Sequence, residues 1–252
     1  MENSSLRARA LSGETLLGCF VTWPAAGITD LLALAGFDFL VLDSEHGFFS
    51  IESIESMVRA ADAVGLPAVV RVPSCSAAEV SRCLDAGSAG TLFPRADGVG
   101  AVKGAIESAK FPPLGKRGLG GARANRYGTI PLDRFVREAN EGTLAAVQIE
   151  TAGALADLDA IAGEPQVDVL YVGPNDLTQA LGIPGQADDP KYQAEVTWIA
   201  SVARRAGKAA GIMLGKIDQI GPLREKGYTF FTTSDRTVLL ESARKWRAAL
   251  PR

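Results

Sequence analysis

The sequence has few of the side chains that carry imidazole or thiol chemistry. Its 252 residues include one histidine, His46, and three cysteines, Cys19, Cys75 and Cys83. Any step that needs an imidazole therefore has a single candidate. The cysteines form no CxxC pair, which favours a reduced, cytoplasmic protein.

Long hydrophobic runs and long runs of like charge are also missing. No stretch approaches the roughly 18 apolar residues of a membrane span. Residues 1–18 lack the uninterrupted apolar core of a secretory signal. The net charge is −3 and there is no basic run, so we expect neither a nucleic acid nor a membrane as a partner.

Strand-like and helix-like stretches alternate along the chain, and 47% of its residues are hydrophobic. The strand-like runs are residues 18–22, 37–42, 68–72, 91–93, 144–150, 169–172, 209–214 and 229–233. The helix-like stretches are residues 28–35, 50–64, 76–86, 99–110, 153–161, 189–206 and 238–250. This alternation predicts an α/β fold, a (β/α)8 TIM barrel formed as one domain by residues 1–252. A doubly wound sheet also alternates, but eight units fit the barrel better.

Two stretches interrupt the alternation. Residues 111–128 are rich in glycine and arginine, and residues 178–190 are rich in turn-forming residues. Both are longer than ordinary connections, and such loops are often functional. The second follows Asp176 closely, so we expect it to cover a site or to contact a neighbouring subunit.

Two acidic residues stand where neighbouring strands end. Glu150 closes the run LAAVQIE, and Asp176 follows the run VLYVGPN. A helix-like segment between them indicates parallel strands joined by a right-handed crossover, so both carboxylates reach the same edge of the sheet. Carboxylate oxygens at that edge suit a hard divalent cation. Alternatively, Asp176 is a helix cap and Glu150 a solvated neighbour of the cap Thr151.

Other polar residues stand at the ends of the second and third strands. His46 follows Asp43 by three residues, so that carboxylate can orient the imidazole, although a lone histidine is more often structural. Arg71 lies in the otherwise apolar run VVRVP and needs an anionic partner if buried. Asp85 ends a helix, which leaves its role open, and Trp23 fits packing better than chemistry.

These residue types together favour the chemistry of 2-oxo acids. A divalent cation chelated by a 2-oxo acid polarises its ketone and stabilises an enolate. A fixed arginine stabilises the developing oxyanion, and a base of near-neutral pKa moves the proton. Aldol addition and retro-aldol cleavage of oxo acids use these components.

Six motifs give the chain a family resemblance. They are LDSEHG (42–47), VVRVP (69–73), LDAGSAGTLFP (84–94), PPLGKRGLGGARANRYG (112–128), VQIET (147–151) and YVGPNDLTQALG (171–182). In order and spacing the chain resembles the HpcH/HpaI aldolases, the class II pyruvate aldolases typified by the 4-hydroxy-2-oxoheptanedioate and 2-dehydro-3-deoxyglucarate enzymes. The resemblance implies a metal-dependent cleavage of 4-hydroxy-2-oxo acids to pyruvate, or oxaloacetate as the related oxo acid, and an aldehyde.

The resemblance also implies roles for single residues. Glu150 and Asp176 are implied metal ligands, and oxygen ligands favour Mg2+ or Mn2+, with Co2+ and Zn2+ as alternatives. His46, oriented by Asp43, is the implied base, and Arg71 is implied to hold pyruvate. The remaining implied site residues are Asp85, from the same or a neighbouring subunit, and the substrate-contacting Trp23, Gln148, Gly173, Pro174, Asn175 and Arg123. The resemblance further implies a homohexamer in which the last helix packs on a partner barrel.

Two departures from the family pattern affect the substrate more than the chemistry. Arg95 adds charge near the rim, and Asn175 replaces a residue that is often small.

Three other functions stay open at this point. They are an acyl-CoA carbon–carbon lyase of the citrate lyase beta or malyl-CoA type, using the basic run GKRGLGGAR; a phosphate-binding barrel isomerase, using GIMLGK (211–216); and a relative without activity.

Overall fold

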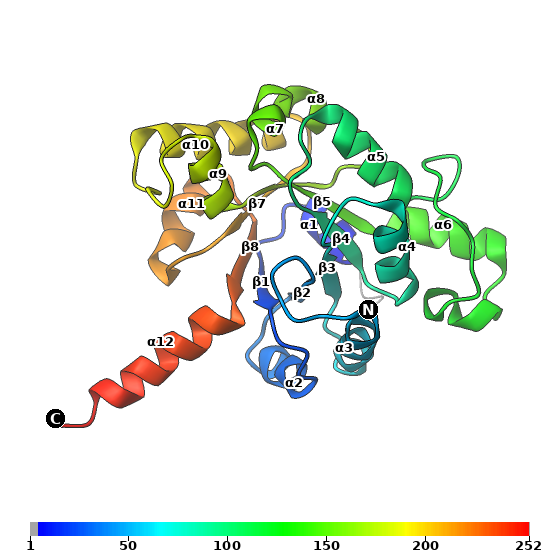
Figure 1. The fold of residues 1–252 in the computed structure, drawn as a ribbon, viewed down its shortest axis with the longest axis horizontal. Coiled ribbons are helices and arrows are strands. Elements are labelled where there is room, and N and C mark those ends of the chain that lie inside the picture. Colours follow the sequence, from blue (N-terminus) through cyan, green and yellow to red (C-terminus); the bar gives the residue numbers. More distant parts are fainter. Residues whose placement is uncertain (1–4, 252) are drawn as a thin grey trace.

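The computed structural model describes residues 5–251, and its centre is a closed barrel of eight parallel strands in sequence order (Figure 1). The strands are β1 (Leu16–Val21), β2 (Phe39–Asp43), β3 (Ala68–Arg71), β4 (Gly90–Phe93), β5 (Leu144–Gln148), β6 (Val169–Val172), β7 (Ala209–Met213) and β8 (Phe230–Ser234). β8 pairs with β1 and closes the sheet, with Leu16 opposite Phe230. The predicted (β/α)8 architecture is thereby confirmed.

Helices surround the barrel and connect its strands (Figure 1). They are α1 (Leu6–Leu11), α2 (Gly27–Leu34), α3 (Ile51–Ala63), α4 (Ala77–Asp85), α5 (Val99–Ala109), α6 (Leu132–Gly142), α7 (Ala152–Ala156), α8 (Leu158–Ala162), α9 (Pro174–Ala180), α10 (Pro190–Arg205), α11 (Ile220–Lys226) and α12 (Asp235–Ala248). Two 3-10 turns, η1 (Arg123–Gly128) and η2 (Ile217–Gln219), complete the connections. None of the helices in the described part is long and apolar enough to cross a membrane.

Several elements differ from the sequence-based expectations. The helix expected over residues 153–161 is divided into α7 and α8, since Asp157 leaves helical geometry between them. The expected fifth strand ends at Gln148, so Glu150 lies just beyond the ladder. Helices α1, α6 and α11 were not predicted. The apolar residues of α6 have the spacing of an amphipathic helix, Leu132, Phe135, Val136 and Ala139, so the sequence did hold a signal for it.

The strand residues divide into two hydrophobic clusters by their alternation. Leu16, Phe39 and Val69 belong to a cluster inside the barrel, whereas Cys19, Leu40 and Val70 pack outward against the helices. Alternation continues to the carboxyl ends of the strands, so Asp43, Arg71 and Gln148 share the inward register. This register directs the polar side chains into the mouth of the barrel.

Glycine at position 18 makes room for an inward aromatic ring. A Cβ on Gly18 would overlap the ring of Phe39, which packs on Phe230 with the ring centroids 4.3 Å apart. At the amino-terminal end of the barrel, Leu6 and Ala10 of α1 join the inner cluster and cover that opening. The carboxyl-terminal end is therefore the open end.

Helix α12 projects away from the barrel instead of packing along it (Figure 1). Asp235 is its one buried residue in the described chain. Leu239 and Trp246 are 61% and 79% exposed. An isolated helix with such apolar residues gains little stability from its own hydrogen bonds, because helices in proteins depend on tertiary packing.

Candidate functional site

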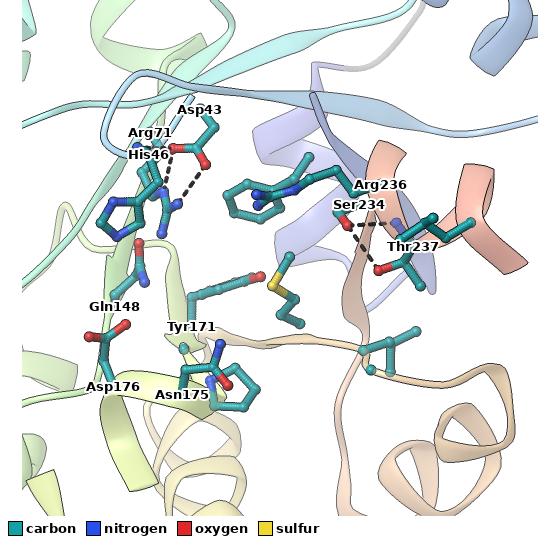
Figure 2. Close-up of a pocket in the computed structure, with 17 residues that line it drawn as sticks. Asp43, His46, Arg71, Gln148, Tyr171, Asn175, Asp176, Ser234, Arg236 and Thr237 are labelled. Carbon is teal, nitrogen blue, oxygen red and sulfur yellow. Dashed lines mark hydrogen bonds and ion pairs between the residues drawn. The ribbon is translucent and has the colours of Figure 1, made fainter. Parts of the chain in front are cut away.

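A cavity of about 600 Å3 opens at the carboxyl ends of the strands. Figure 2 shows the side chains that surround it. They are Phe20, Asp43, His46, Arg71, Gln148, Tyr171, Gly173, Pro174, Asn175, Asp176, Met213, Leu214, Gly215, Ser234, Arg236, Thr237 and Leu240. The size is typical of a small-molecule site, and the position is the one at which TIM barrels carry their active sites.

Arg71 is held by two carboxylates at the mouth of the barrel. Its Nε and Nη2 donate to Asp43 Oδ1 and Oδ2 at 3.0 and 2.7 Å, and its Nη1 lies 3.2 Å from Glu45 Oε2. Burial alone would raise the pKa of Asp43, but the hydrogen bonds and charge of Arg71 hold that pKa below its usual value. The guanidinium is therefore a fixed positive charge in the site.

His46 lies on a tight turn that follows β2. Asp43 Oδ1 accepts hydrogen bonds from the main-chain N–H groups of His46 and Glu45 at 3.0 and 3.2 Å. The imidazole is 61% exposed and its Nε2 lies 3.9 Å from Glu45 Oε2. Asp43 thus contacts the main chain of His46 and the side chain of Arg71, and the carboxylate nearest to the imidazole is that of Glu45. This differs from the predicted role of Asp43 in orienting the ring.

Glu150 is buried just beyond the end of β5. Its Oε2 accepts a hydrogen bond from Gln148 Nε2 at 2.5 Å, and its Oε1 accepts one from the main-chain N–H of Arg95 at 2.9 Å. Burial, with further contributions from the charges of Asp176 and Glu45, raises the pKa of Glu150 to about 7. A buried carboxyl beside other carboxyls favours a neighbouring cation.

Asp176 lies in the first turn of α9 and faces Glu150 across a second cavity. This cavity of about 400 Å3 is lined by Arg95, Asp97, Glu150, Thr151, Ala152, Asp176, Gln179 and Ala180. Asp176 belongs to both cavities, so the two adjoin at its side chain. Arg95 Nη1 lies 3.6 Å from Asp176 Oδ1 and partly neutralises it.

The residues around Glu150 fit a hard divalent cation. No group of three or more His, Cys, Asp or Glu side chains that could hold a metal is found in residues 5–251. The available ligands are therefore the two carboxylates of Glu150 and Asp176, a set that suits Mg2+ completed by water or substrate oxygens. In addition, the carboxamide oxygen of Gln148 is buried without a hydrogen-bond partner.

Gly173 is required for this arrangement. A Cβ at position 173 would clash with Glu150 Oε2 and with the amide nitrogen of Gln148. The φ angle of Gly173 is −93°, a value that every residue adopts, so the requirement is one of space. The motif YVGPND thus combines the candidate ligand Asp176 with the room that the carboxylate of Glu150 needs.

Most of the predicted site residues meet at this cavity. Those that line it are Asp43, His46, Arg71, Gln148, Gly173, Pro174, Asn175 and Asp176, with Glu150 in the adjoining cavity. Trp23 follows β1 and is 40% exposed, but it does not line the cavity.

Asp85 and Arg123 lie at the opposite end of the barrel. Asp85 ends α4, before β4 begins, and accepts a hydrogen bond from Arg117 Nη2 at 2.6 Å. Arg123 donates to the carbonyl oxygen of Ala86 at 3.0 Å and pairs with Asp62. Neither residue lines the cavity of its own chain, so the roles expected of both stay predictions, with a neighbouring subunit as the alternative for Asp85.

Several cavity residues were not identified from the sequence. Phe20, Tyr171, Met213 and Ser234 line the cavity, and each has the inward register of its strand. The alternation that identified Arg71 could have found them. Arg236, one residue into α12, had no comparable signal.

Comparisons with known proteins agree with this geometry. The family model described as HpcH/HpaI aldolase/citrate lyase matches residues 16–240. The chain is 32% identical over 236 residues to 2-dehydro-3,6-dideoxy-6-sulfogluconate aldolase of Pseudomonas putida, covering 93% of this chain and 92% of that one. It is 35% identical over 248 residues to hydroxypyruvate/pyruvate aldolase of Paraburkholderia phytofirmans, covering 95% of each. The crystal structure of an HpcH/HpaI aldolase from Desulfitobacterium hafniense superimposes with a TM-score of 0.92 at 28% identity, covering 98% of each chain. The protein is therefore an enzyme of the HpcH/HpaI aldolase/citrate lyase family.

Proposed function

We propose that this enzyme is a divalent-metal-dependent aldolase that reversibly cleaves 4-hydroxy-2-oxo acids to pyruvate and an aldehyde. The observation that carries the proposal is the buried Glu150, paired with Asp176, beside the fixed guanidinium of Arg71. The similarity to aldolases over 93% of the chain supports it.

Glu150 and Asp176 would hold the cation, with Mg2+ or Mn2+ favoured by the oxygen ligands and Co2+ or Zn2+ as alternatives. When bound, the cation supplies Lewis-acid polarisation of the 2-oxo group. Gln148 fixes one oxygen of Glu150 through its amide, and Arg95 fixes the other through its main chain. The carboxylate is thereby oriented before substrate arrives.

Arg71 binds the oxo-acid part of the substrate. Because Asp43 and Glu45 hold the guanidinium, its charge is in place where the enolate oxygen develops, without further reorganisation. His46 accepts the proton of the 4-hydroxyl group in the cleavage direction. As that proton leaves, the C3–C4 bond breaks, its electron pair passes to C3 as the enolate of pyruvate, and C4 becomes the aldehyde carbon. A proton delivered to C3 completes pyruvate.

The arrangement of α12 supports a homo-oligomer, and we propose a hexamer in which this helix packs on a neighbouring barrel. Its exposed apolar residues Leu239 and Trp246 would be buried there. Asp85 would then serve a neighbouring site. Light scattering of the purified enzyme at several concentrations measures the molar mass of the particle in solution, and the mass of a single chain would contradict the hexamer.

We further propose that the one barrel domain acts in the cytoplasm.

Two other activities have less support. A CoA site in the run GKRGLGGAR would need free basic groups, yet Arg117 is 2% exposed and Arg123 is paired with Asp62. A phosphate-binding isomerase would need an anion site after β7 and β8. After β8, the main-chain N–H groups of Arg236 and Thr237 donate to the side chains of Asp235 and Ser234, so they are not free to bind phosphate.

Exchange of the pyruvate methyl protons tests the proposal without a choice of aldehyde. Proton NMR in D2O should show exchange that requires Mg2+ or Mn2+ and is lost in Glu150→Gln. The exposed Glu225→Gln on α11 is a matched control that should keep the wild-type rate. Exchange that persists in Glu150→Gln with a chelator present would reject the metal-dependent mechanism.

A further inference from the structure

A cavity of about 250 Å3 lies beside the amino-terminal ends of β4 and β5, and we call it the basal cavity. Its walls include Leu84, Ser88, Arg117, Ile130, Phe135 and Thr143. None of its lining residues belongs to the larger cavity at the carboxyl ends of the strands or to the cavity beside Glu150. The basal cavity is far larger than one water molecule needs, and it is close in size to the sites that bind small molecules.

Arg117 brings a buried positive charge to the basal cavity. Its side chain is 2% exposed. Nη2 donates to Asp85 Oδ1 at 2.6 Å, and the guanidinium carbon lies 4.6 Å from the centre of the Phe111 ring, so the group is held from two sides. Neither Nε nor Nη1 has a hydrogen-bond partner in residues 5–251, and Nε is buried. A buried charged donor without an acceptor is costly, so the guanidinium favours an acceptor that enters the cavity.

Ser88 contributes a hydroxyl group to the same cavity. It lies between α4 and β4, and its residue is 9% exposed. Its Oγ is buried and has no hydrogen-bond partner in the described part of the chain. Buried hydroxyl groups in folded proteins normally have such a partner. Two unsatisfied donors in the lining of one cavity therefore point to a ligand that accepts a hydrogen bond from each of them.

The charges around the basal cavity favour an anion. The Nζ of Lys110 lies behind its wall and donates to the carbonyl oxygen of the lining residue Thr143 at 2.8 Å. Burial lowers the pKa of Lys110 to about 8, because this ammonium group is surrounded by carbonyl oxygens and not by a carboxylate. The acidic lining residue Glu138 is already paired with Arg134 at 2.6 Å. A ligand with a negative charge would thus be attracted to the inner wall of the cavity.

We propose that the basal cavity binds a small carboxylate with a short apolar tail. The carboxylate oxygens accept hydrogen bonds from Arg117 and Ser88, since a guanidinium binds such a group with several donors at once. The tail lies against Ile130 and Phe135, which would disfavour a second charged group there. Because the two cavities share no residue, this ligand and pyruvate bind at the same time.

The test uses sodium butyrate as the probe and butyramide as its neutral counterpart of the same shape. Ile130 lines the basal cavity and Met213 lines the larger cavity, so labelled isoleucine and methionine methyl groups report on the two sites separately in NMR spectra. The Ile130 signal is identified by its loss in Ile130→Val. Butyrate should shift this signal to saturation, with the same affinity when pyruvate and Mg2+ are present. Butyramide should bind at least about tenfold more weakly, because it lacks the charged hydrogen bonds.

Two variants that each lose a buried hydroxyl group complete the test. Ser88→Ala should weaken butyrate binding at Ile130 about 3- to 10-fold. Thr91→Val is the matched control, because Thr91 Oγ1 is also buried without a partner in residues 5–251 but does not line the cavity. It should keep the wild-type affinity.

Three results would overturn the proposed site. The first is the absence of a saturable shift of Ile130 in the wild-type enzyme, and the second is an equal affinity for butyrate and butyramide. The third is a butyrate shift at Ile130 that pyruvate abolishes, which would place the ligand at Arg71. None of these results bears on the aldolase proposal, whose own test is the exchange of the pyruvate methyl protons.

Discussion

Arg71 and Asp43 are direct neighbours across the β2–β3 ladder, and they form a bidentate ion pair inside the barrel mouth. The parallel register places the two residues opposite each other, and the alternation of both strands turns them inward. Asp43 is 1% exposed and the Arg71 side chain 11%. Strand pairing therefore determines the position of the charge that we assign to substrate binding.

Asp43→Asn should destabilise the fold as well as the site, because it leaves the buried guanidinium of Arg71 with only Glu45 as a partner. Breaking a buried pair typically costs about 3 kcal/mol, and urea unfolding at pH 7 measures this. The folded pKa of Asp43 is lowered, so its contribution is present above the usual aspartate pKa of about 4 and is lost as the pH falls through the folded value. The difference in the free energy of unfolding between wild type and Asp43→Asn should therefore become smaller as the pH is lowered.

Glu45→Gln provides the comparison for this prediction. Glu45 contacts Arg71 Nη1 at 3.2 Å but does not share the bidentate geometry, so its substitution should cost less stability than Asp43→Asn. Equal losses of unfolding free energy in the two variants would mean that the bidentate pair with Asp43 stabilises the fold no more than the single contact with Glu45.

Alternation along the strands accounts for what the sequence revealed about the site. It placed Arg71 and Gln148 on the inner face from the runs VVRVP and VQIE, and the structure has both in the cavity. It also placed Glu150 and Asp176 at neighbouring strand ends, where they border one cavity. These predictions needed only the period of the strand and the parallel crossover.

Side-chain partners and distant contacts could not be predicted in this way. The carboxylate of Asp43 binds the guanidinium of Arg71, 28 residues away, in addition to the main chain of His46. Arg236 lies in the cavity because Thr22 and Asp235 join the start of α12 to β1, across 213 residues of sequence. Neither contact leaves a periodic pattern in the sequence.

Gly173→Ala should abolish pyruvate methyl exchange while leaving the barrel folded. The added Cβ would displace the carboxylate of Glu150 and the amide of Gln148. Gly104→Ala is the matched control, since Gly104 lies in the middle of α5 and nothing lies within 4 Å of its added Cβ. That control should keep full exchange and gain about 0.5–1 kcal/mol of stability from the helix propensity of alanine. A wild-type rate of pyruvate methyl exchange in Gly173→Ala would show that the reaction does not depend on this position of the Glu150 carboxylate.

Arg95→Gly should tighten Mn2+ binding. Arg95 has a left-handed φ of 51°, which glycine adopts easily, so the main-chain N–H that donates to Glu150 should stay in place. The change removes a guanidinium that lies 3.6 Å from Asp176 and repels a cation there. Because the side chain is largely exposed, we expect only about a 2- to 5-fold gain at low salt, which fades at high salt.

Arg126→Gly makes the same substitution at the same φ of 51°, in η1 at the other end of the barrel. Electron paramagnetic resonance of free Mn2+ during a titration measures both variants. Equal affinities in wild type, Arg95→Gly and Arg126→Gly would show that the arginine has no electrostatic effect on the cation.

Cys75 should react slowly with iodoacetamide although it is only half-buried. Its Sγ donates to the carbonyl oxygen of Pro94 at 3.6 Å, and burial, together with the charges of Glu45 and Glu79, raises its pKa from 9.0 to about 11. The thiolate is the reacting form, so at pH 8 the rate should be about 100-fold below that of the same thiol in the unfolded chain. The rate should rise about tenfold per pH unit up to pH 10.

The raised pKa of Cys75 also determines whether stability rises or falls with pH. Between pH 9 and about 11 the unfolded chain loses the Cys75 proton before the folded chain does, so this thiol lowers stability as the pH rises through that range. Cys75→Ser should weaken that alkaline decline relative to wild type, as measured by urea unfolding at pH 8 and pH 10. Fast alkylation at pH 8, at the rate of the urea-unfolded chain, would show instead that Cys75 is an accessible thiolate at the edge of the site.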